Sequence, residues 1–423
     1  MKNKIHPLPT RHTPSRRTPH FSFFIFHFSF FIFLVPLSTP VHAQEQDRYS
    51  FIRYEANTLH YDSAAVPLQT FFQRWQRVVE TGSGNLNIVH IGGSHVQAGV
   101  LSNTVRCRLL AAYPDRVGDR GMLFPYSAAA KCNNPPDYRI HCHERMLLNR
   151  CVAKEHERPL GLCGIAVTAA DTVTEVQVVL SRDVDYATNR VVVLGRSDDP
   201  QLIPLLHVDG RDIYPSYVDP RTERFVFNLS QSVDSFAVVL PCEEGQQFTL
   251  TGLYLGNRRD GISFHSIGVN GAAVPDYLRC QHFTRDLRLL HPDAVVFGIG
   301  INDASGPNFD TAVFRRNYLQ LIDSIRSVNP DCAFIFVTNN DSFRKIGRRK
   351  YAVNTNGALA REVFYRLAAE TGGAVWDQYE IMGGLRSMDL WRKAKLGRPD
   401  RVHFTAAGWT AWACLTKTIQ FNH

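Results

Sequence analysis

Residues 87–99 read NIVHIGGSHVQAG, and this stretch decides the fold. Asn87–Ile91 is an apolar run of strand length that ends at the glycine pair Gly92-Gly93. An amphipathic helix follows it, so Ser94 stands at a tight strand-to-helix turn. Such a turn exposes a serine hydroxyl at the carboxyl end of a sheet and points its backbone N–H towards a reacting carbonyl. Because Gly-Ser turns are common, Ser94 indicates chemistry only together with partners elsewhere in the chain.

The C-terminal half repeats the alternation of short apolar strands and amphipathic helices. We expect strands at 294–297 and 333–337, and helices at 311–328, 357–371 and 405–420. This alternation predicts an α/β fold with a parallel sheet that is covered by helices on both faces.

The middle of the chain has a different pattern, with short β-like runs, turn-rich connections and no helical periodicity. Six such runs are Val176–Leu180, Arg190–Leu194, Ile203–Val208, Phe225–Leu229, Ser235–Leu240 and Phe248–Leu255. Strands at this spacing favour a β-sandwich, so an all-β module interrupts the α/β domain.

Two later segments supply partners for Ser94. Asp400 and His403 are three residues apart, a spacing at which the carboxylate reaches imidazole Nδ1 and leaves Nε2 free as a base. Gly271 lies in a loop, and Asn302 follows the strand at 294–297. A glycine N–H and an asparagine amide are both donors suited to a developing oxyanion.

Together and in this order, these segments resemble the blocks of the SGNH (GDSL-type) hydrolase family. The matching blocks are Gly92-Gly93-Ser94 with Gly99, then Gly271, then Gly300-Ile301-Asn302-Asp303, and finally Asp400-x-x-His403. The resemblance implies a three-layer α/β/α SGNH hydrolase with a flavodoxin-like parallel sheet. It implies Ser94 as nucleophile, His403 as base and Asp400 as its orienting acid. The Ser94 N–H, the Gly271 N–H and the Asn302 side chain would form the oxyanion hole.

One position departs from the family pattern. The residue before the serine is normally Asp, which anchors the turn by hydrogen bonds, and here it is Gly93. The remaining side chains of the site are intact, so we expect an active enzyme. The alternative is a non-catalytic glycan-binding protein with a degenerate site.

The inserted β-sandwich is similar to the insertion of peptidoglycan O-acetylesterases, where it looks like a carbohydrate-binding module. We therefore expect a first part of the hydrolase domain at 44–125, the inserted sandwich at 126–257 and the second part at 258–423. The expected substrate is an acetylated glycan, with peptidoglycan first. Rival substrates are other acetylated polysaccharides, sialic acid or a lipid, and acetyl transfer to a sugar would use the same triad. No metal or organic cofactor is needed.

The N-terminus has the layout of a signal peptide over 1–43: a basic region, the apolar run 21–35 and small residues before Gln44. The protein is therefore expected in the periplasm or secreted, without stable membrane insertion after the signal is removed. The formal net charge is +8, but the leader carries five basic residues and no acidic one. The net charge of +3 on the remaining residues is too small to indicate a surface that binds nucleic acid.

Three further features leave alternatives open. Cys132, Cys142, Cys151 and Cys163 lie within 32 residues, which makes one or two local disulfides reasonable in an exported protein. His95 either touches substrate or packs against the first helix. The basic run 344–350 is either a solvated loop or a surface near an anionic polymer.

Overall fold

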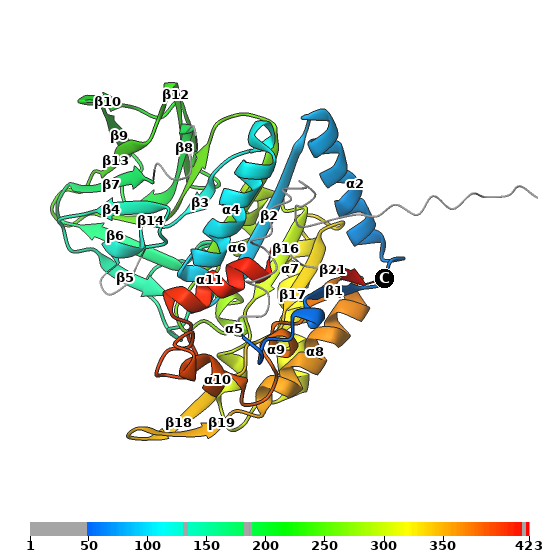
Figure 1. The fold of residues 1–423 in the computed structure, drawn as a ribbon. Helices are drawn as coiled ribbons and strands as arrows, with labels where there is room; N and C mark the ends of the chain where they lie inside the picture. Colours follow the sequence, from blue (N-terminus) through cyan, green and yellow to red (C-terminus); the bar gives the residue numbers. More distant parts are fainter. Residues whose placement is uncertain (1–48, 130–133, 182–185, 187, 417–419, 423) are drawn as a thin grey trace, which may run out of the picture.

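The computed structural model describes residues 49–129, 134–181, 186, 188–416 and 420–422 (Figure 1). The expected signal peptide at 1–43 lies outside these residues. Within the described part of the chain, no helix has the length and apolar character needed to cross a membrane.

The centre of the molecule is a seven-stranded sheet with the order β15-β2-β16-β17-β20-β1-β21. Its strands are β1 (Thr58–Tyr61), β2 (Asn85–Gly92), β15 (Gly261–Gly268), β16 (Ala294–Gly298), β17 (Ala333–Val337), β20 (Ala374–Trp376) and β21 (Gln420–Asn422). The first five strands of this order run parallel, whereas β1 pairs antiparallel with β20. From β2 the chain reaches β15 on one side, and after β15 it crosses to β16 on the other side of β2; such a reversal of strand order is the switch point where open α/β sheets bind ligands.

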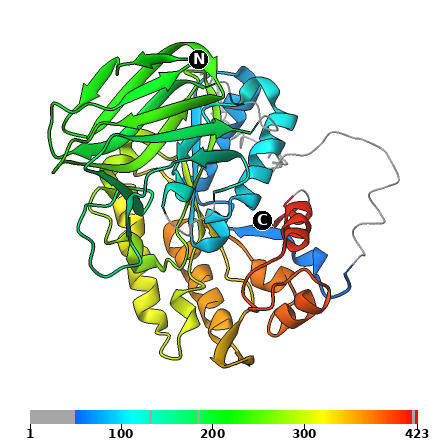
Figure 2. The same cartoon turned by 90° about the vertical axis from the view of Figure 1, so that its left-hand side faces the viewer.

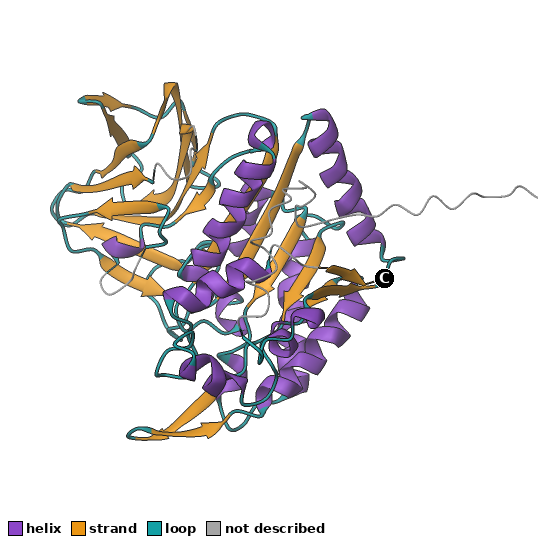
Figure 3. Cartoon of the chain, viewed as in Figure 1, coloured by secondary structure: helices purple, strands orange, loops and turns teal. Residues whose placement is uncertain are grey.

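Helices cover both faces of this sheet, as Figure 3 shows in purple. They are α2 (Val66–Thr81), α3 (Ser94–Gln97), α4 (Val100–Ala112), α5 (Val274–Tyr277), α6 (Phe283–Leu290), α7 (Thr311–Arg326), α8 (Asn356–Thr371), α9 (Gln378–Ile381), α10 (Ser387–Lys393) and α11 (Ala406–Leu415). Because side chains alternate along a strand, Ile88 packs with the helices α2, α4 and α11. Its neighbour Val89 belongs to the opposite core, which contains α6, α7 and α8.

Residues between β2 and β15 build two further antiparallel sheets, seen side-on in Figure 2. One contains β4 (Tyr138–His141), β7 (Thr174–Leu180), β9 (Leu205–Val208), β10 (Arg211–Ile213) and β13 (Ser235–Leu240). The other contains β3 (Gly121–Leu123), β5 (Leu147–Arg150), β6 (Ile165–Ala170), β8 (Thr188–Ser197), β11 (Tyr217–Asp219), β12 (Arg224–Val233) and β14 (Gln247–Gly256). All six predicted β-runs lie on these strands, and the predicted α/β architecture with an inserted β-sandwich is confirmed.

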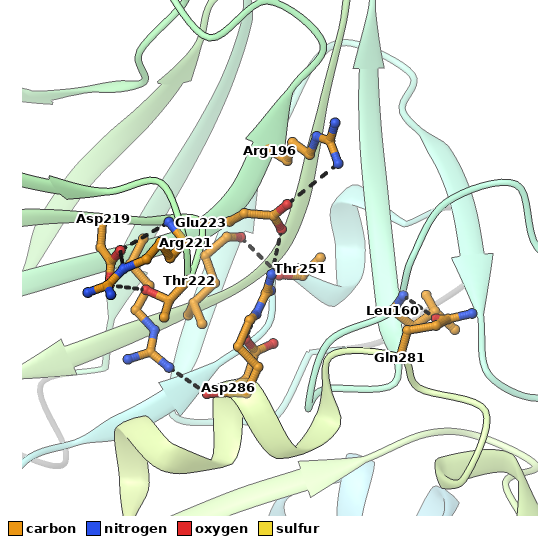
Figure 4. A network of polar contacts seen from close by, with 12 residues as sticks. Leu160, Arg196, Asp219, Arg221, Thr222, Glu223, Thr251, Gln281 and Asp286 are labelled. Carbon is orange, nitrogen blue, oxygen red and sulfur yellow. Dashed lines mark hydrogen bonds and ion pairs between the residues drawn. The ribbon is translucent and has the colours of Figure 1, made fainter.

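A polar network joins the sandwich to α6; we call it the seam and define it as Glu223, Arg224, Arg285 and Asp286. Figure 4 labels Glu223 and Asp286 in this network. Arg285 bonds Glu223 at 2.7 Å and Asp286 at 2.9 Å. Arg224 donates to the backbone oxygen of Arg285 at 2.7 Å. These bonds fix the sandwich against the face of the parallel-sheet region that carries α6.

Three expectations need correction. The last helix ends at Leu415 instead of residue 420, and β21 follows it. The basic run at 344–350 belongs to a two-stranded hairpin, β18 (Phe343–Gly347) and β19 (Lys350–Val353). No local disulfide joins Cys142, Cys151 or Cys163, which are all free thiols, and Cys132 lies outside the described residues.

Candidate active site

Three residues from distant parts of the chain form one hydrogen-bonded series. Ser94 is the first residue of α3, directly after β2, and its Oγ lies 2.9 Å from His403 Nε2. The other ring nitrogen of His403, Nδ1, lies 3.0 Å from Asp400 Oδ2. The structure therefore brings together Ser94, His403 and Asp400 in the order that the sequence predicts.

A tight turn before α11 positions Asp400 under the imidazole. Asp400 Oδ1 accepts the backbone N–H groups of Val402 and His403, both at 2.9 Å. Arg401 adopts the left-handed φ of 60°, which lets the chain double back over three residues. Burial alone would raise the pKa of Asp400, but the hydrogen bonds from the His403 side chain and from the two backbone N–H groups hold it well below its usual range. Asp400 is therefore an anion facing Nδ1 at all physiological pH values.

Two of the predicted oxyanion donors lie in loops next to the turn that carries Ser94, since a Cβ at Gly93 would lie 3.4 Å from Asn302 Nδ2 and 3.5 Å from Ala272 O, the neighbour of Gly271. Asn302 follows β16, and its Nδ2 donates one hydrogen bond to Ala272 O at 2.9 Å, which leaves its second N–H available. Gly271 has a left-handed φ of 85°, and a Cβ there would meet no atom within 4 Å, so its N–H borders open space. Among the described residues, neither the Ser94 N–H nor the Gly271 N–H donates to a protein acceptor.

The turn at Ser94 is anchored without an Asp at position 93. The hydroxyl of Tyr277 donates to Gly92 O at 2.8 Å, and Val269 N donates to the same oxygen at 3.2 Å. Gly93 O accepts the first two backbone N–H groups that close the turn of α3. Tyr277 was not expected from the sequence, because nothing in its own neighbourhood signals a bond to a residue 185 positions away.

The ring of His95 packs against the ring of the predicted base, His403. Its ring meets His403 edge-on at 5.2 Å between centroids and Trp409 of α11 at 5.3 Å. Burial, together with the nearby charge of a protonated His403, lowers the pKa of His95 to about 3, so it stays neutral. Of the two expectations for His95, packing against a helix is met at α11, through the ring of Trp409.

A small cavity of about 40 Å³ lies next to His95. Its lining contains His90, His95, Asn339, Asn340 and Trp409 and does not include Ser94. It has room for about one or two water molecules, and its lining also includes the apolar side chains of Val96, Leu101, Ile301 and Val337.

This arrangement has the chemical parts of a nucleophilic acyl transfer: a serine, a base, an orienting carboxylate and, in neighbouring loops, N–H donors suited to an oxyanion. No cluster of three or more metal-ligating side chains occurs among the residues that the structure describes.

Comparison with known proteins gives a family match. Residues 246–411 match the model of the GDSL-like Lipase/Acylhydrolase family. The match includes Gly271, Asn302, Asp400 and His403, and begins after Ser94. No curated protein matches the chain by sequence.

Solved structures add a match for the fold. A structure described as "Peptidoglycan O-acetylesterase in action, 5 min" superposes with a TM-score of 0.68 at 20% identity, over 85% of this chain and 97% of that chain. A lipase/acylhydrolase from Enterococcus faecalis (24% identity, 37% of this chain, 74% of that chain) and the acetyl xylan esterase AlAXEase (21%, 36%, 79%) both reach a TM-score of 0.29. The superposition on the peptidoglycan O-acetylesterase structure extends over nearly all the residues that the structure describes.

Proposed function

We propose that this chain is a carboxylic ester hydrolase of the SGNH/GDSL type, and that it is an exported serine esterase that removes O-acetyl groups from peptidoglycan. The match of residues 246–411 to the GDSL-like Lipase/Acylhydrolase family supports the reaction class. The observation that carries the proposal is the continuous series Ser94–His403–Asp400, with hydrogen-bond distances of 2.9 and 3.0 Å. The similarity of the whole fold, sandwich included, to a peptidoglycan O-acetylesterase supports the choice of substrate.

The first half of the reaction forms an acetyl-enzyme. Ser94 Oγ attacks the acetyl carbonyl carbon while His403 Nε2 takes the hydroxyl proton. The negative charge on the carbonyl oxygen is stabilised by the Ser94 N–H, the Gly271 N–H and the Asn302 amide. Each such donor contributes about 3–4 kcal/mol in the transition state. When the tetrahedral intermediate collapses, His403 returns the proton to the sugar oxygen, which leaves as an alcohol.

The second half releases acetate. His403 removes a proton from water, whose oxygen attacks the acetyl carbon, and the collapse of this intermediate restores Ser94 with the proton from His403. Asp400 stays ionised throughout and stabilises the imidazolium in both halves.

The test compares p-nitrophenyl acetate with butyrate and octanoate esters, and wild-type protein with Ser94→Ala. We expect turnover to fall with acyl length, and Ser94→Ala to lower kcat by about 10⁴-fold or more. Acetate released from O-acetylated peptidoglycan is then measured by an enzymatic acetate assay.

Two results would refute the proposal. Equal turnover in wild type and Ser94→Ala would show that Ser94 is not the nucleophile. Faster turnover of the octanoate ester than of the acetate ester would indicate a lipid ester as the substrate. Acetyl groups recovered on an added sugar acceptor, in excess of free acetate, would reassign the same triad to transfer.

A further inference from the structure

The β18–β19 hairpin projects from the body of the molecule, at the lower edge of Figure 1. Its residues 343–353 read FRKIGRRKYAV, with five Lys or Arg and no Asp or Glu. Four of these cations are exposed: Lys345, Arg348, Arg349 and Lys350. A hairpin of this composition has unbalanced positive charge along its whole length.

The base of the hairpin is attached to the loop that carries the catalytic base. Phe343 N donates to Arg401 O at 3.1 Å. The guanidinium of Arg401 lies over the rings of Phe343 and Tyr351, at 5.0 and 4.8 Å from their centroids. Since Arg401 is two residues before His403, the hairpin begins at the rim of the site.

The other end of the hairpin is attached to the loop of the amide donor. Asn354, directly after β19, donates through Nδ2 to Ala304 O at 3.1 Å, two residues beyond Asn302. Asn354 is buried, so this bond is shielded from water. The hairpin is thus held at both ends by the two loops that supply His403 and Asn302.

The segment 386–403 extends the positive surface along the same rim. It contains six Lys or Arg and two Asp. Both acids are already engaged, since Asp389 pairs with Arg401 at 3.2 Å and Asp400 bonds His403. The exposed cations of this segment are Arg386, Lys393, Lys395 and Arg398. We call the hairpin and this segment together the basic rim.

We propose that the basic rim binds carboxylate groups of an acidic glycan while an acetyl ester of the same polymer lies at Ser94. The inference rests on the proposed function, because it names the chemical class of the polymer. Residues 44–423 carry a net charge of only +3, so the positive charge is concentrated at this rim and is not a general property of the surface. A positive surface beside a site raises the local concentration of an anionic substrate, and a neutral polysaccharide gains nothing from it. Cell-wall glycan, with carboxylates on its peptide stems, has the required charge.

The test is a charge-neutralised rim with a matched control. The rim variant is Lys345→Gln/Arg348→Gln/Arg349→Gln/Lys350→Gln, and the control is Arg77→Gln/Arg211→Gln/Arg288→Gln/Arg316→Gln, four exposed cations elsewhere. Both variants lose four positive charges. For each protein, kcat/KM on soluble O-acetylated peptidoglycan fragments is divided by kcat/KM on p-nitrophenyl acetate.

At low salt we expect this ratio to fall about tenfold in the rim variant and to stay at the wild-type value in the control. In wild type the ratio should also fall as NaCl rises from 50 to 500 mM, because added salt screens exposed charges. An unchanged ratio in the rim variant, or an equal fall in the control, would overturn the proposal.

Cosedimentation with insoluble, de-O-acetylated peptidoglycan separates this inference from the proposed function, because it needs no turnover. Binding that the rim variant loses supports the rim even if no acetate is released from glycan. The same assay with phosphatidylglycerol vesicles and with DNA tests other polyanions. Rim-dependent binding to either of these, with glycan binding unchanged, would refute an acidic glycan as the partner.

Discussion

Two regions of this molecule are built around a carboxylate that accepts hydrogen bonds, and they differ in exposure. At the carboxyl edge of the parallel sheet, the side chains of Asp400 and His403 are 46% and 38% exposed. At the seam between the sandwich and α6, the side chain of Asp286 is 1% exposed and bonds Arg285 and the Leu162 N–H (Figure 4). The hydrogen bonds of Asp400 are therefore accessible to solvent and substrate, whereas those of Asp286 are buried.

The difference in exposure predicts whether replacing the carboxylate costs activity or stability. An exposed carboxylate that is replaced can be compensated by water, so the fold tolerates its loss, but the imidazole loses its orientation. Replacing a buried carboxylate removes one of the partners of the Arg285 guanidinium and leaves the Leu162 N–H without its acceptor, and water does not restore these bonds. We therefore expect changes at the edge to cost activity and changes at the seam to cost stability.

The largest effect is expected for Asp400→Asn. An amide at this position no longer holds the tautomer with a proton on Nδ1 and no longer stabilises the imidazolium, and kcat should fall by about 10⁴-fold. The free energy of unfolding should change by less than about 1 kcal/mol, because the pair is exposed. Esterase kinetics and urea unfolding check the two parts separately.

The sandwich offers a matched control for this change. His207 Nδ1 lies 2.9 Å from Asp212 Oδ1, compared with 3.0 Å between His403 and Asp400; this second His–Asp pair is also exposed but lies far along the chain from Ser94. Asp212→Asn should leave kcat unchanged. A loss of activity that is equal in the two variants would contradict the role of Asp400.

The seam should show the opposite result. Asp286→Ala removes one of the two carboxylates that bond Arg285, whose bond to Glu223 remains, and leaves the Leu162 N–H without its acceptor; it should lower the free energy of unfolding by about 2–3 kcal/mol. Asp286→Asn keeps an acceptor for the Leu162 N–H and should cost less. Urea unfolding measures both, and kcat of the folded fraction should stay near wild type. If Asp286→Ala unfolds like wild type, the seam does not stabilise the molecule.

The sequence predicts the parts of this comparison that depend on local pattern. The period of the apolar residues predicts the helices α7 and α8 and the strands β2, β16 and β17, because each buries one face or both faces against its neighbours. The spacing of Asp400 and His403 within one turn predicts their bond, whose partners lie three residues apart. The bond from Ser94 to His403 spans 309 residues, and the sequence predicts it only through the resemblance to a family.

Contacts between elements escape a sequence-based prediction. Nothing local marks Glu223 and Arg285 as partners, since their positions become adjacent only when the sandwich packs on α6. The hairpin at 343–353 was missed because its charged residues mask the alternation of its strands. Helix α11 ends early because the chain beyond it joins β1 as β21, a tertiary pairing that overrides the helical pattern.

A smaller effect is expected on the pH dependence of stability, at Asp303, the residue that follows Asn302. Burial raises its pKa to about 7, although the backbone N–H of Val274 counteracts this by donating to it at 3.2 Å. Because the folded pKa lies above the unfolded value of about 3.9, the folded state binds the proton more tightly. The stability from this group is therefore full below about pH 4 and is lost as pH rises to 7, by about 1 kcal/mol per pH unit.

Asp303→Asn cannot titrate and should remove this slope. The measurement is urea unfolding of wild type and variant between pH 4.5 and 7.5, with the difference between the two proteins plotted against pH. A difference that is independent of pH would show that Asp303 titrates at the same pH in the folded and unfolded chain.

The smallest effect is expected at Gly93, the position where the family carries Asp. A Cβ at residue 93 would lie 3.4 Å from Asn302 Nδ2 and 3.5 Å from Ala272 O, which are ordinary contacts. Gly93→Ala should therefore change the free energy of unfolding by less than about 1 kcal/mol and kcat/KM by less than about tenfold. In Gly92→Ala the Cβ would lie 2.2 Å from Val96 Cγ2 and 2.6 Å from Gly298 O, so this neighbour should destabilise strongly. If instead Gly93→Ala abolishes turnover of p-nitrophenyl acetate in a folded protein, the bare backbone at this position is itself part of the site, and the absence of Asp is a requirement of this chain.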